Sequence, residues 1–358
     1  MSNTPFFSII LPSYKVEEYL ESAVSSILNQ TFSDYEIIIV DDASPDSVGS
    51  IADCLCEKYS FIKAVHHQTN LGLSEARNSG FRECSGEFVF FMDPDDVLES
   101  TLLEKVKNAL ENQMSDVVVF GVTEEYYNNK NELCNSVTIK HSDNPLYLNT
   151  KEEIRSEMIF LEKNTLLGYA WNKVYKRDYL INEKTEFETV EFIEDITFNI
   201  RVFDNLSSLI ILSDPLYHYI KRVNAGLTSK YSENFYAVHR KRVEMIFEQY
   251  KKWDMLSTDV YNILGSEFAR FVFSSAQRNC SKKSNMSRKE RLAFIRSVYD
   301  DEIYKTLIPK AFSESKSVKI MLALLKKKSV HLTALACRLL YIIKAVFPVF
   351  FSKIKQDR

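Results

Sequence analysis

Short, continuously apolar runs alternate with segments of helical periodicity over the first third of the chain. The runs occupy residues 6–11, 36–40, 61–66, 88–92 and 116–121. Between them, apolar residues recur at the spacing of an amphipathic helix, as between Leu20 and Leu28. Strands that are apolar on both faces need a layer of helices on each side, and this alternation favours parallel strands. We therefore expect a doubly wound, mostly parallel, Rossmann-like α/β sheet, with Pro12 ending the first strand.

Carboxylates follow two of these runs directly. Asp41 and Asp42 follow the second run, and Asp93, Asp95 and Asp96 follow the fourth. Open α/β sheets bind ligands outside the carboxyl ends of their strands, so these acids are expected at a ligand site. A cluster of hard oxygen ligands there suits a divalent cation that grips the phosphates of a substrate. The alternative is structural: one acid of the second cluster caps the following helix, and the others face water.

Five stretches of sequence extend this pattern. They read SIILPSY at 8–14, SILNQTF at 26–32, IVDDAS at 39–44, NLGLSEARNSG at 70–80 and FMDPDD at 91–96. In order and spacing they resemble the nucleotide-sugar glycosyltransferases of family 2, of the bacterial surface-polysaccharide type, which have the GT-A fold. A weaker likeness continues through WNKVY at 171–175 and EDITFN at 194–199. The resemblance implies a GT-A catalytic domain over residues 1–230, with a nucleotide-binding half to about residue 121 and an acceptor half from about residue 122.

The resemblance assigns the nucleotide to the ends of the first two strands. Pro12, Ser13 and Tyr14 match the loop that packs around the base, and Asp42 matches the acid that pairs with the base. Asp41 is its neighbour in the expected donor site. For both acids, a strand-end or turn position is the structural alternative.

The same resemblance makes Asp93 and Asp95 the DxD pair of a metal-dependent transferase. The pair would bind the ribose and a Mn2+ or Mg2+ ion that bridges the diphosphate, with Asp95 the direct ligand and Asp96 its support. Such an ion stabilises the negative charge that builds on the leaving phosphate. Arg77 lies where family members carry an arginine near the ribose phosphate, and a solvated helix position is its alternative. His218 could complete the metal shell or be a structural histidine packed between two tyrosines.

Glycosyl transfer also requires a base that takes the proton of the acceptor hydroxyl, and a carboxylate near the donor usually provides it. Glu194 and Asp195 match the acidic pair of the family at the start of a helix beneath the acceptor, and Asp195 is the expected base. Complementing the positive end of that helix is an alternative role that does not exclude catalysis. Lys221 or Arg222 would hold the diphosphate, although this segment departs from the family pattern.

Helices alone are expected over residues 231–358, and positive charge is concentrated near the end. Residues 305–358 contain twelve Lys or Arg against two acids, although the whole chain has a net charge of −4. The last apolar periodicity runs from Leu332 to Phe347, and Arg338 and Lys344 interrupt it, so it falls short of the about 20 apolar residues that span a bilayer. We expect a basic amphipathic helix at the inner face of the plasma membrane. A docked helix with a solvated tail is the alternative, and no nucleic-acid-binding motif accompanies the charge.

The resemblance, together with these patterns, implies a function. The chain would be an inverting, metal-dependent transferase that moves one sugar from a nucleotide-sugar donor, expected to be UDP-linked, to a lipid-linked glycan acceptor of a bacterial capsule, lipopolysaccharide or exopolysaccharide. It would be cytoplasmic, since no signal peptide is visible and the six cysteines form no disulfide framework. Trp171 and Lys173 could line the acceptor pocket, unless the tryptophan belongs to the core. The alternative is a non-catalytic sugar-nucleotide-binding or scaffold protein of a polysaccharide assembly complex.

Overall fold

The computed structural model describes residues 4–190, 193–222 and 233–346 of the 358-residue chain. The chain divides into two compact units, Met1–Gly226 and Leu227–Arg358. The division falls between residues 223 and 232, outside the described residues, and the domain boundary expected at residue 230 lies there too.

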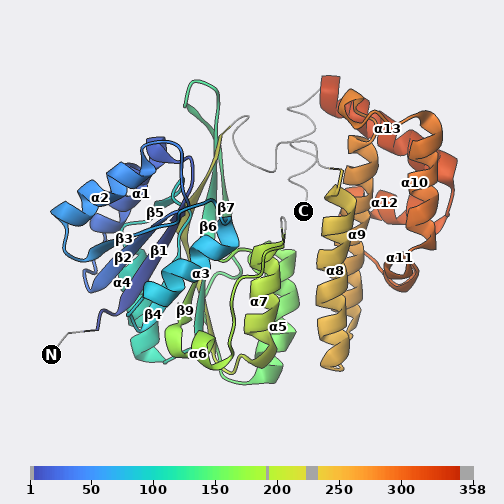
Figure 1. Ribbon diagram of the computed structural model, residues 1–358. Coiled ribbons are helices and arrows are strands. Elements are labelled where there is room, and N and C mark those ends of the chain that lie inside the picture. The colour runs from blue at the N-terminus through green and yellow to red at the C-terminus, as the bar shows by residue number, and fades with distance from the viewer. Residues whose placement is uncertain (1–3, 191–192, 223–232, 347–358) are drawn as a thin grey trace. The chain divides into compact units, whose positions relative to one another are not determined.

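A single mixed sheet forms the centre of the first unit (Figure 1). Its strand order is β3-β2-β1-β4-β9-β6-β10-β5, with β7 paired to β6 and β8 paired to β10. The strands are β1 (Phe7–Ser13), β2 (Tyr35–Asp41), β3 (Ile62–His66), β4 (Phe88–Phe91), β5 (Val97–Leu98), β6 (Val117–Tyr127), β7 (Leu133–Ile139), β8 (Leu146–Leu148), β9 (Lys173–Lys176) and β10 (Leu209–Arg222). Strands β1 to β4 are parallel, as are β6 and β10, whereas β9 runs antiparallel between the two groups. The expected mostly parallel α/β sheet is confirmed, with β9 as an antiparallel insertion and β5, β7 and β8 as further antiparallel strands.

The path of the chain across the sheet makes the carboxyl edge between β1 and β4 the expected place for a ligand. The helices of this unit are α1 (Glu17–Leu28), α2 (Val48–Lys58), α3 (Leu73–Glu83), α4 (Leu102–Asn112), α5 (Lys151–Lys163), α6 (Arg177–Asn182) and α7 (Glu194–Asn205). The chain passes from β1 through β2 to β3 and then returns past β1 to β4. Because such crossovers are right-handed, this reversal puts α3 on the opposite face of the sheet from α1 and α2. Open α/β sheets bind ligands at the carboxyl ends of the strands that flank such a reversal.

Burial on both faces explains why the first strands are continuously apolar. The side chains of Ile9–Leu11, Ile37–Val40 and Phe88–Phe91 are at most 1% exposed. On α3, a Cβ at Gly80 would lie 2.4 Å from Ile10 Cγ2, so this helix lies directly on the sheet. The close approach of α3 brings the side chains of its first turns to the carboxyl edge of the sheet.

Pro12 does not end β1, contrary to expectation. The strand continues through Pro12 to Ser13. The nitrogen of Phe7 donates toward β2, to Asp34 O at 3.2 Å, so the alternation along the strand points the Pro12 nitrogen toward β4. Strand β4 has already ended, at Phe91. The proline is therefore accommodated without the loss of a ladder hydrogen bond.

Two strands are longer than the sequence suggests. Strand β6 extends past the expected end at Gly121 to Tyr127 and pairs with β7. Strand β10 is 14 residues long and continues through Pro215, with register shifts on both sides of that proline. The region from 122 to 190, for which the sequence gives no clear pattern, contributes β7, β8, α5, β9 and α6.

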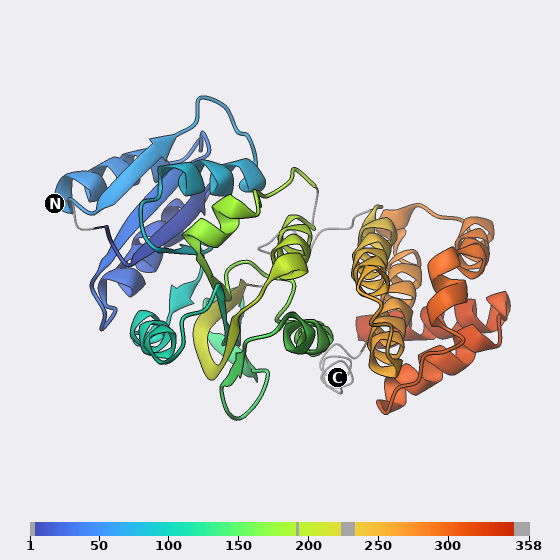
Figure 2. The same ribbon diagram turned by 90° about the horizontal axis from the view of Figure 1, so that it is seen from below.

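The second unit is helical in its described residues, as the periodicity predicts (Figures 1 and 2). Its helices are α8 (Phe235–Lys252), α9 (Thr258–Arg278), α10 (Arg288–Asp300), α11 (Glu302–Leu307), α12 (Lys316–Lys326) and α13 (Val330–Val346), with a short 3-10 turn at Lys282–Ser284. Helix α9 lies at the centre of the unit and contacts each of the other five helices.

Helix α13 packs on this unit by one face and leaves another face exposed. Thr333 and Cys337 are buried, and Thr333 Oγ1 lies 2.8 Å from Tyr299 Oη of α10. Four apolar side chains on α13 are 46–55% exposed: Leu332, Leu335, Leu339 and Ile342. No helix among the described residues is long and apolar enough to cross a membrane. Phe347 and the basic residues at 353–358 lie outside the described part of the chain.

Candidate active site

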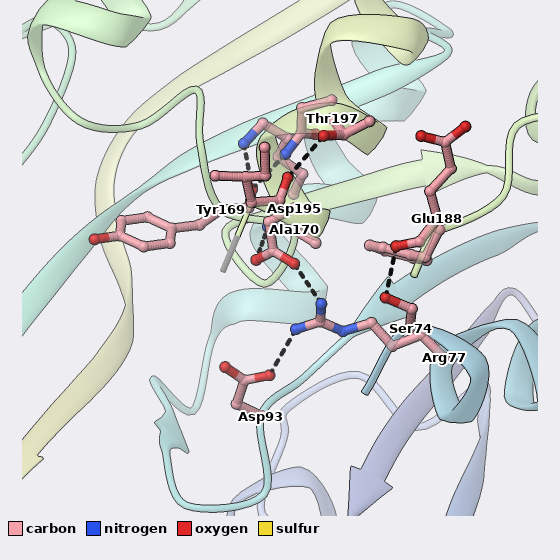
Figure 3. A network of polar contacts seen from close by, with 12 residues as sticks. Ser74, Arg77, Asp93, Tyr169, Ala170, Glu188, Asp195 and Thr197 are labelled. Carbon is pink, nitrogen blue, oxygen red and sulfur yellow. Dashed lines mark hydrogen bonds and ion pairs between the residues drawn. The ribbon is translucent and has the colours of Figure 1, made fainter. Parts of the chain in front are cut away.

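The predicted donor and base residues meet at the carboxyl edge of the sheet. Ser13 ends β1, Asp41 ends β2, and Asp93 follows closely after β4. Helix α3 brings Arg77 to the same place, and the first turn of α7 brings Asp195 (Figure 3). Segments that are more than a hundred residues apart in sequence thus form one cluster.

Asp42 is turned inward and holds a turn. Its Oδ1 accepts from Leu71 N at 2.8 Å and lies 2.7 Å from His67 Nδ1, and its Oδ2 accepts from Gly72 N at 2.8 Å. The side chain is only 3% exposed. Gly72 has a φ of 89°, a conformation that glycine adopts without strain. Pairing of Asp42 with the base, as the resemblance implies, would require the carboxylate to leave these partners, so we regard Asp42 as the residue that shapes this loop.

Asp41 has internal partners but stays nearer the surface. Its Oδ1 accepts from Ser44 N at 2.8 Å, and its Oδ2 lies 3.1 Å from His66 Nδ1. This hydrogen bond is the main cause that raises the pKa of His66, and Asp53 at the other ring nitrogen adds to the effect. The Asp41 side chain is 11% exposed and lies at the rim of the cluster.

At the end of β1, Tyr14 is the member of the expected base-binding loop that reaches solvent. It is 41% exposed, whereas Pro12 and Ser13 are buried. Ser13 anchors the neighbouring strand end, because its carbonyl accepts from Asp42 N at 3.0 Å. Of the three loop residues, Tyr14 is therefore the one whose ring is disposed to stack on a nucleotide base.

Asp96 ties the end of β4 to β10. Its Oδ1 accepts from Ile220 N and its Oδ2 accepts from Tyr217 Oη, both at 2.8 Å. The same Tyr217 Oη accepts from Asp93 N at 3.2 Å. Asp96 is 1% exposed, and burial raises its pKa well above the usual range. The helix-capping alternative is wrong for Asp96, since α4 begins only at Leu102.

Asp93 and Asp95 carry charge that their surroundings compensate poorly. Burial raises the pKa of Asp93 to about 7 against the opposing effect of Arg77, and Asp95 contributes to the rise. Burial also raises the pKa of Asp95, while Arg222 opposes it. A carboxylate whose pKa is raised in this way is stabilised by either a proton or a nearby cation.

These acids fit a divalent ion that is shared with a phosphate. Carboxylate oxygens such as those of Asp93 and Asp95 are ligands that Mg2+ and Mn2+ bind. Within the described ranges, no three His, Cys, Asp or Glu side chains gather closely enough to hold a metal ion by themselves. Magnesium commonly combines one or two carboxylates with substrate phosphates and water. The residues therefore fit an ion whose coordination a diphosphate would complete.

Arg77 links Asp93, which follows β4, to the expected base Asp195 (Figure 3). Its Nη2 donates to Asp93 Oδ1 at 3.0 Å, and its Nη1 donates to Asp195 Oδ1. Burial alone would lower the pKa of Arg77, but the neighbouring acids outweigh it and the pKa is raised. The resemblance implies a position near the ribose phosphate, whereas the structure places the guanidinium between two carboxylates.

Glu194 and Asp195 form the first turn of α7, as expected. Asp195 Oδ2 accepts from Ala170 N at 3.1 Å, so a backbone amide and Arg77 hold one oxygen each. The Asp195 side chain is 17% exposed. Burial, followed by the charge of Asp195, raises the pKa of Glu194. Asp195 thus combines a fixed orientation with access to solvent, which a general base needs.

Trp171 and Lys173 belong to the core rather than to an open acceptor pocket. Trp171 is 3% exposed and stacks between Tyr169 and Tyr217, with ring centres 4.4 and 4.5 Å apart. Lys173 is fully buried, and its Nζ donates to three backbone carbonyls within residues 166–169. Together they hold the turn before β9, in which the backbone amide of Ala170 donates to Asp195.

Arg222 faces the acidic cluster, and Lys221 does not. Arg222 Nη1 donates to the Asp95 carbonyl at 3.2 Å, and its guanidinium lies 4.0 Å from the centre of the Tyr19 ring. A cavity of about 310 Å³ opens beside this contact, between α1 and the end of β10, and Asp95 and Arg222 line it. Lys221 instead pairs with Glu124 at 2.7 Å. Of the two candidates for the diphosphate, the geometry favours Arg222.

His218 does not join the acidic cluster. Alternation along β10 turns its side chain to the face opposite Tyr217, whose hydroxyl binds Asp96. Its Nδ1 lies 2.8 Å from Glu125 Oε1, and its Nε2 lies 3.1 Å from Glu99 Oε2. Both ring nitrogens are engaged there, so the metal-ligand role expected of His218 does not fit this geometry. A structural histidine does fit, paired with two acids rather than packed between two tyrosines.

Sequence reasoning missed the groups that orient the acids. Tyr217 precedes His218 in the sequence, but its bond to Asp96 joins positions 121 residues apart. The amide of Ala170 carries no side-chain signal at all. These contacts emerge only when β9 and β10 join β4 in one sheet.

Comparison with known proteins agrees with this fold. Residues 8–181 match the family model described as glycosyl transferase family 2. The chain is 31% identical over 222 residues to the uncharacterized glycosyltransferase EpsJ of Bacillus subtilis (strain 168), a match that covers 62% of each protein. It is 28% identical over 276 residues to the cholesterol galactosyltransferase of Borreliella burgdorferi, with 74% of this chain and 73% of that protein covered. The chain therefore matches somewhat less than two thirds of the length of EpsJ.

Among solved structures, TarS 1–349 of Staphylococcus aureus in complex with UDP-GlcNAc superposes with a TM-score of 0.61. The superposition covers 92% of this chain and 89% of that chain at 20% sequence identity. This likeness shows a shared fold, and the expected GT-A fold class is confirmed. The family match and the curated relatives together show that the first unit of this chain belongs to glycosyl transferase family 2.

Proposed function

We propose that the chain transfers a single sugar, with inversion at the anomeric carbon, from a nucleotide-sugar donor to a glycan acceptor in bacterial surface-polysaccharide synthesis. The observation that carries the proposal is the buried guanidinium of Arg77, which joins Asp93 at the donor edge to Asp195 at the start of α7. A donor anchored at Asp93 would then lie next to a carboxylate that can serve as a base.

The donor side of the proposal rests on the acids after β4. Asp95 would be the direct ligand of a Mn2+ or Mg2+ ion and Asp93 would add one oxygen, while Asp96 holds the loop in place. When bound, such an ion neutralises the charge that develops on the leaving diphosphate. Arg222, which lies beside Asp95, would supply a second positive charge. A UDP-linked donor is supported by the fold shared with TarS, whose structure was solved with UDP-GlcNAc.

The acceptor side rests on Asp195. Its carboxylate would take the proton of the acceptor hydroxyl while that oxygen attacks the anomeric carbon from the face opposite the diphosphate. The bond between the anomeric carbon and the phosphate oxygen breaks, and its electron pair leaves with the nucleotide diphosphate. Arg77 and the Ala170 amide hold the carboxylate during this transfer.

Location at a membrane is the second part of the proposal. The exposed stripe of Leu332, Leu335, Leu339 and Ile342 on α13 offers an apolar face, and Lys326–Lys328 precede the helix. Such a face beside basic residues suits the surface of an anionic bilayer. The names of two relatives support a glycan or lipid acceptor: one is named for cholesterol, and TarS is named for poly(ribitol-phosphate). A lipid-linked acceptor at the inner face of the membrane fits both features.

A panel of sugar nucleotides tests the enzymatic proposal before the acceptor is known. With Mn2+ present, we expect the protein to release the nucleotide diphosphate from one donor, with water as the acceptor, and excess EDTA to stop the release. Asp195→Asn should lower the rate by roughly 10²–10⁴-fold, as expected for loss of a general base, while Mn2+-dependent binding of UDP persists. Asp178→Asn, at an exposed acid in the first turn of α6, is the matched control and should leave the rate unchanged.

Each result has a defined opposite. Full turnover in excess EDTA would contradict the metal role. Asp195→Asn turnover within a few-fold of wild type would move the base elsewhere, with Glu194 next. Tight binding of a sugar nucleotide without turnover, even with membrane extracts as a source of acceptor, would favour the non-catalytic alternative.

A further inference from the structure

The buried guanidinium of Arg77 has no surface left for a donor phosphate. The side chain is 1% exposed, and the guanidinium lies 5.0 Å from the centre of the Phe187 ring. Nη1 and Nη2 each donate to a carboxylate, and Nε is buried without a partner. A phosphate contact would need at least one of these groups to be exposed at the site.

The two carboxylates that Arg77 bonds come from different parts of the catalytic unit. Asp93 follows β4, in the nucleotide-binding half, and Asp195 starts α7, in the acceptor half. One guanidinium therefore sets the spacing between the donor edge and the base. A planar, rigid fork of N–H groups can bond two carboxylates at once, which a lysine ammonium on a flexible stem does less well.

The bonds also determine how Asp195 can act. Oδ1 accepts from Arg77 and Oδ2 accepts from the Ala170 amide. Each carboxylate oxygen has two acceptor positions, so each retains one for an acceptor hydroxyl. Without Arg77, Oδ1 would be free to turn about χ2, and the partly buried carboxylates of Asp93 and Asp195 would face each other without a cation between them.

We infer that Arg77 is a positioning residue for the base: it holds Asp195 toward the acceptor at a fixed distance from the metal-binding edge, rather than binding the donor itself. The inference rests on the proposed function, and it differs from the ribose-phosphate role that the family resemblance implies. Asp93 then has Oδ1 committed to Arg77 and offers Oδ2 to an ion.

The test compares binding with turnover in variants of the full-length protein. Arg77→Met removes the bridge, and Arg77→Lys keeps a charge in the same buried place but cannot span both acids. Arg82→Met, at an exposed arginine of the same helix, is the matched control. For each variant, the dissociation constant of UDP with Mn2+ is measured by calorimetry, and the release of UDP from the accepted donor is measured as kcat and KM.

We expect Arg77→Met and Arg77→Lys to lower kcat by about 10²-fold, within the range typical for general-base catalysis, while the dissociation constant of Mn2+-UDP changes less than about threefold. Combining Arg77→Met with Asp195→Asn should cost no more than Asp195→Asn alone, because residues that act as one unit are not additive. Arg82→Met should match wild type in both measurements.

A rise of about tenfold or more in the dissociation constant, with kcat retained, would show that Arg77 binds the donor and would overturn the inference. So would a double variant whose losses multiply. If Arg77→Met fails to fold, Arg77→Lys carries the same comparison. A wild type that binds Mn2+-UDP but turns over no donor would count against the proposed function alone, and the dissociation constants would still decide the role of Arg77.

Discussion

Replacing Asp42 by asparagine tests whether this residue shapes the turn at 70–72 or contacts the nucleotide. The carboxylate accepts three hydrogen bonds, from Leu71 N, Gly72 N and His67 Nδ1, at 2.7–2.8 Å. In asparagine one oxygen becomes an amino group, so at least one backbone N–H will face another donor. The change removes a bond to a charged group and leaves a buried N–H unsatisfied.

The magnitude follows from these two losses. A hydrogen bond to a charged group contributes about 1.5–3 kcal/mol, and an unsatisfied buried donor costs about 1–3 kcal/mol. We therefore expect the free energy of unfolding to fall by about 3 kcal/mol in Asp42→Asn. For a domain of this size, each kcal/mol shifts Tm by about 2–4 °C, so Tm should fall by about 6–12 °C.

Thermal unfolding followed by intrinsic fluorescence measures the shift, and calorimetry with UDP and Mn2+ measures binding in the same preparation. Asp34→Asn is the control and should leave Tm unchanged, because Asp34 is exposed and directly precedes β2, whereas Asp42 directly follows it. If Asp42→Asn keeps the Tm of wild type while the dissociation constant of UDP rises by about tenfold or more, Asp42 serves the base as the family resemblance implies, and our assignment to the 70–72 turn is wrong.

Three further outcomes concern stability and location. Burial opposes the charge of Glu36, but Lys63, Ser8 and Ser85 outweigh it and lower the pKa to about 2. The Glu36 carboxylate should therefore contribute about 3 kcal/mol to the free energy of unfolding above its ordinary pKa of 4.5, and this contribution should be lost as the pH falls toward 2. Glu36→Gln should lower the free energy of unfolding at pH 7, measured by urea denaturation, and make it less dependent on pH in the acid range. Lys173→Met removes one donor from each of three backbone carbonyls, two of which keep a second donor from Asn172 or Asn199, and should lower the urea midpoint. A midpoint equal to that of wild type would mean that water replaces the ammonium. Replacing both Leu335 and Leu339 by serine should reduce sedimentation of the protein with anionic vesicles. Leu133→Ser, at an equally exposed leucine of the first unit, is the control and should leave sedimentation unchanged. If the double variant and the control sediment equally, α13 does not bind the membrane.

Much of the fold up to about residue 121 could be predicted, because the sequence patterns that indicate it are local. The continuous apolar runs predicted β1, β2 and β4, and carboxylates directly after two of them had to lie at the carboxyl edge. The acidic pair at 194–195 was likewise expected at a helix start, where α7 begins.

The structure adds contacts between distant segments that the sequence does not indicate. Nothing near Arg77 in sequence reveals that it bonds a residue 118 positions away. Asp42 and His218 were assigned by position in a motif, but the nearby backbone amides and glutamates that engage them lie in other elements. The sequence predicts that Pro12 ends the first strand, and this is wrong. The effect of a proline depends on which neighbouring strand its nitrogen faces, and the order of the strands sets that side.

Segments with little periodicity were the least predictable. Strand β9 has the sequence KVYK, in which Lys173 is fully buried. A charged residue at such a position normally argues for the surface, since burying a charge is costly unless it is paired. Here three backbone carbonyls accept hydrogen bonds from the Lys173 ammonium. Contacts to backbone carbonyls cannot be predicted from the pattern of side chains.

The most direct test of an inverting transfer with Asp195 as the base is the anomer that forms first. Proton NMR can follow the sugar that wild type releases from an α-linked UDP-sugar in the presence of Mg2+, before the free sugar equilibrates. We expect the β anomer to appear first, and Asp195→Asn to release sugar no faster than roughly 10⁻² of the wild-type rate. First appearance of the α anomer, or release by Asp195→Asn at the wild-type rate, would contradict the proposed mechanism.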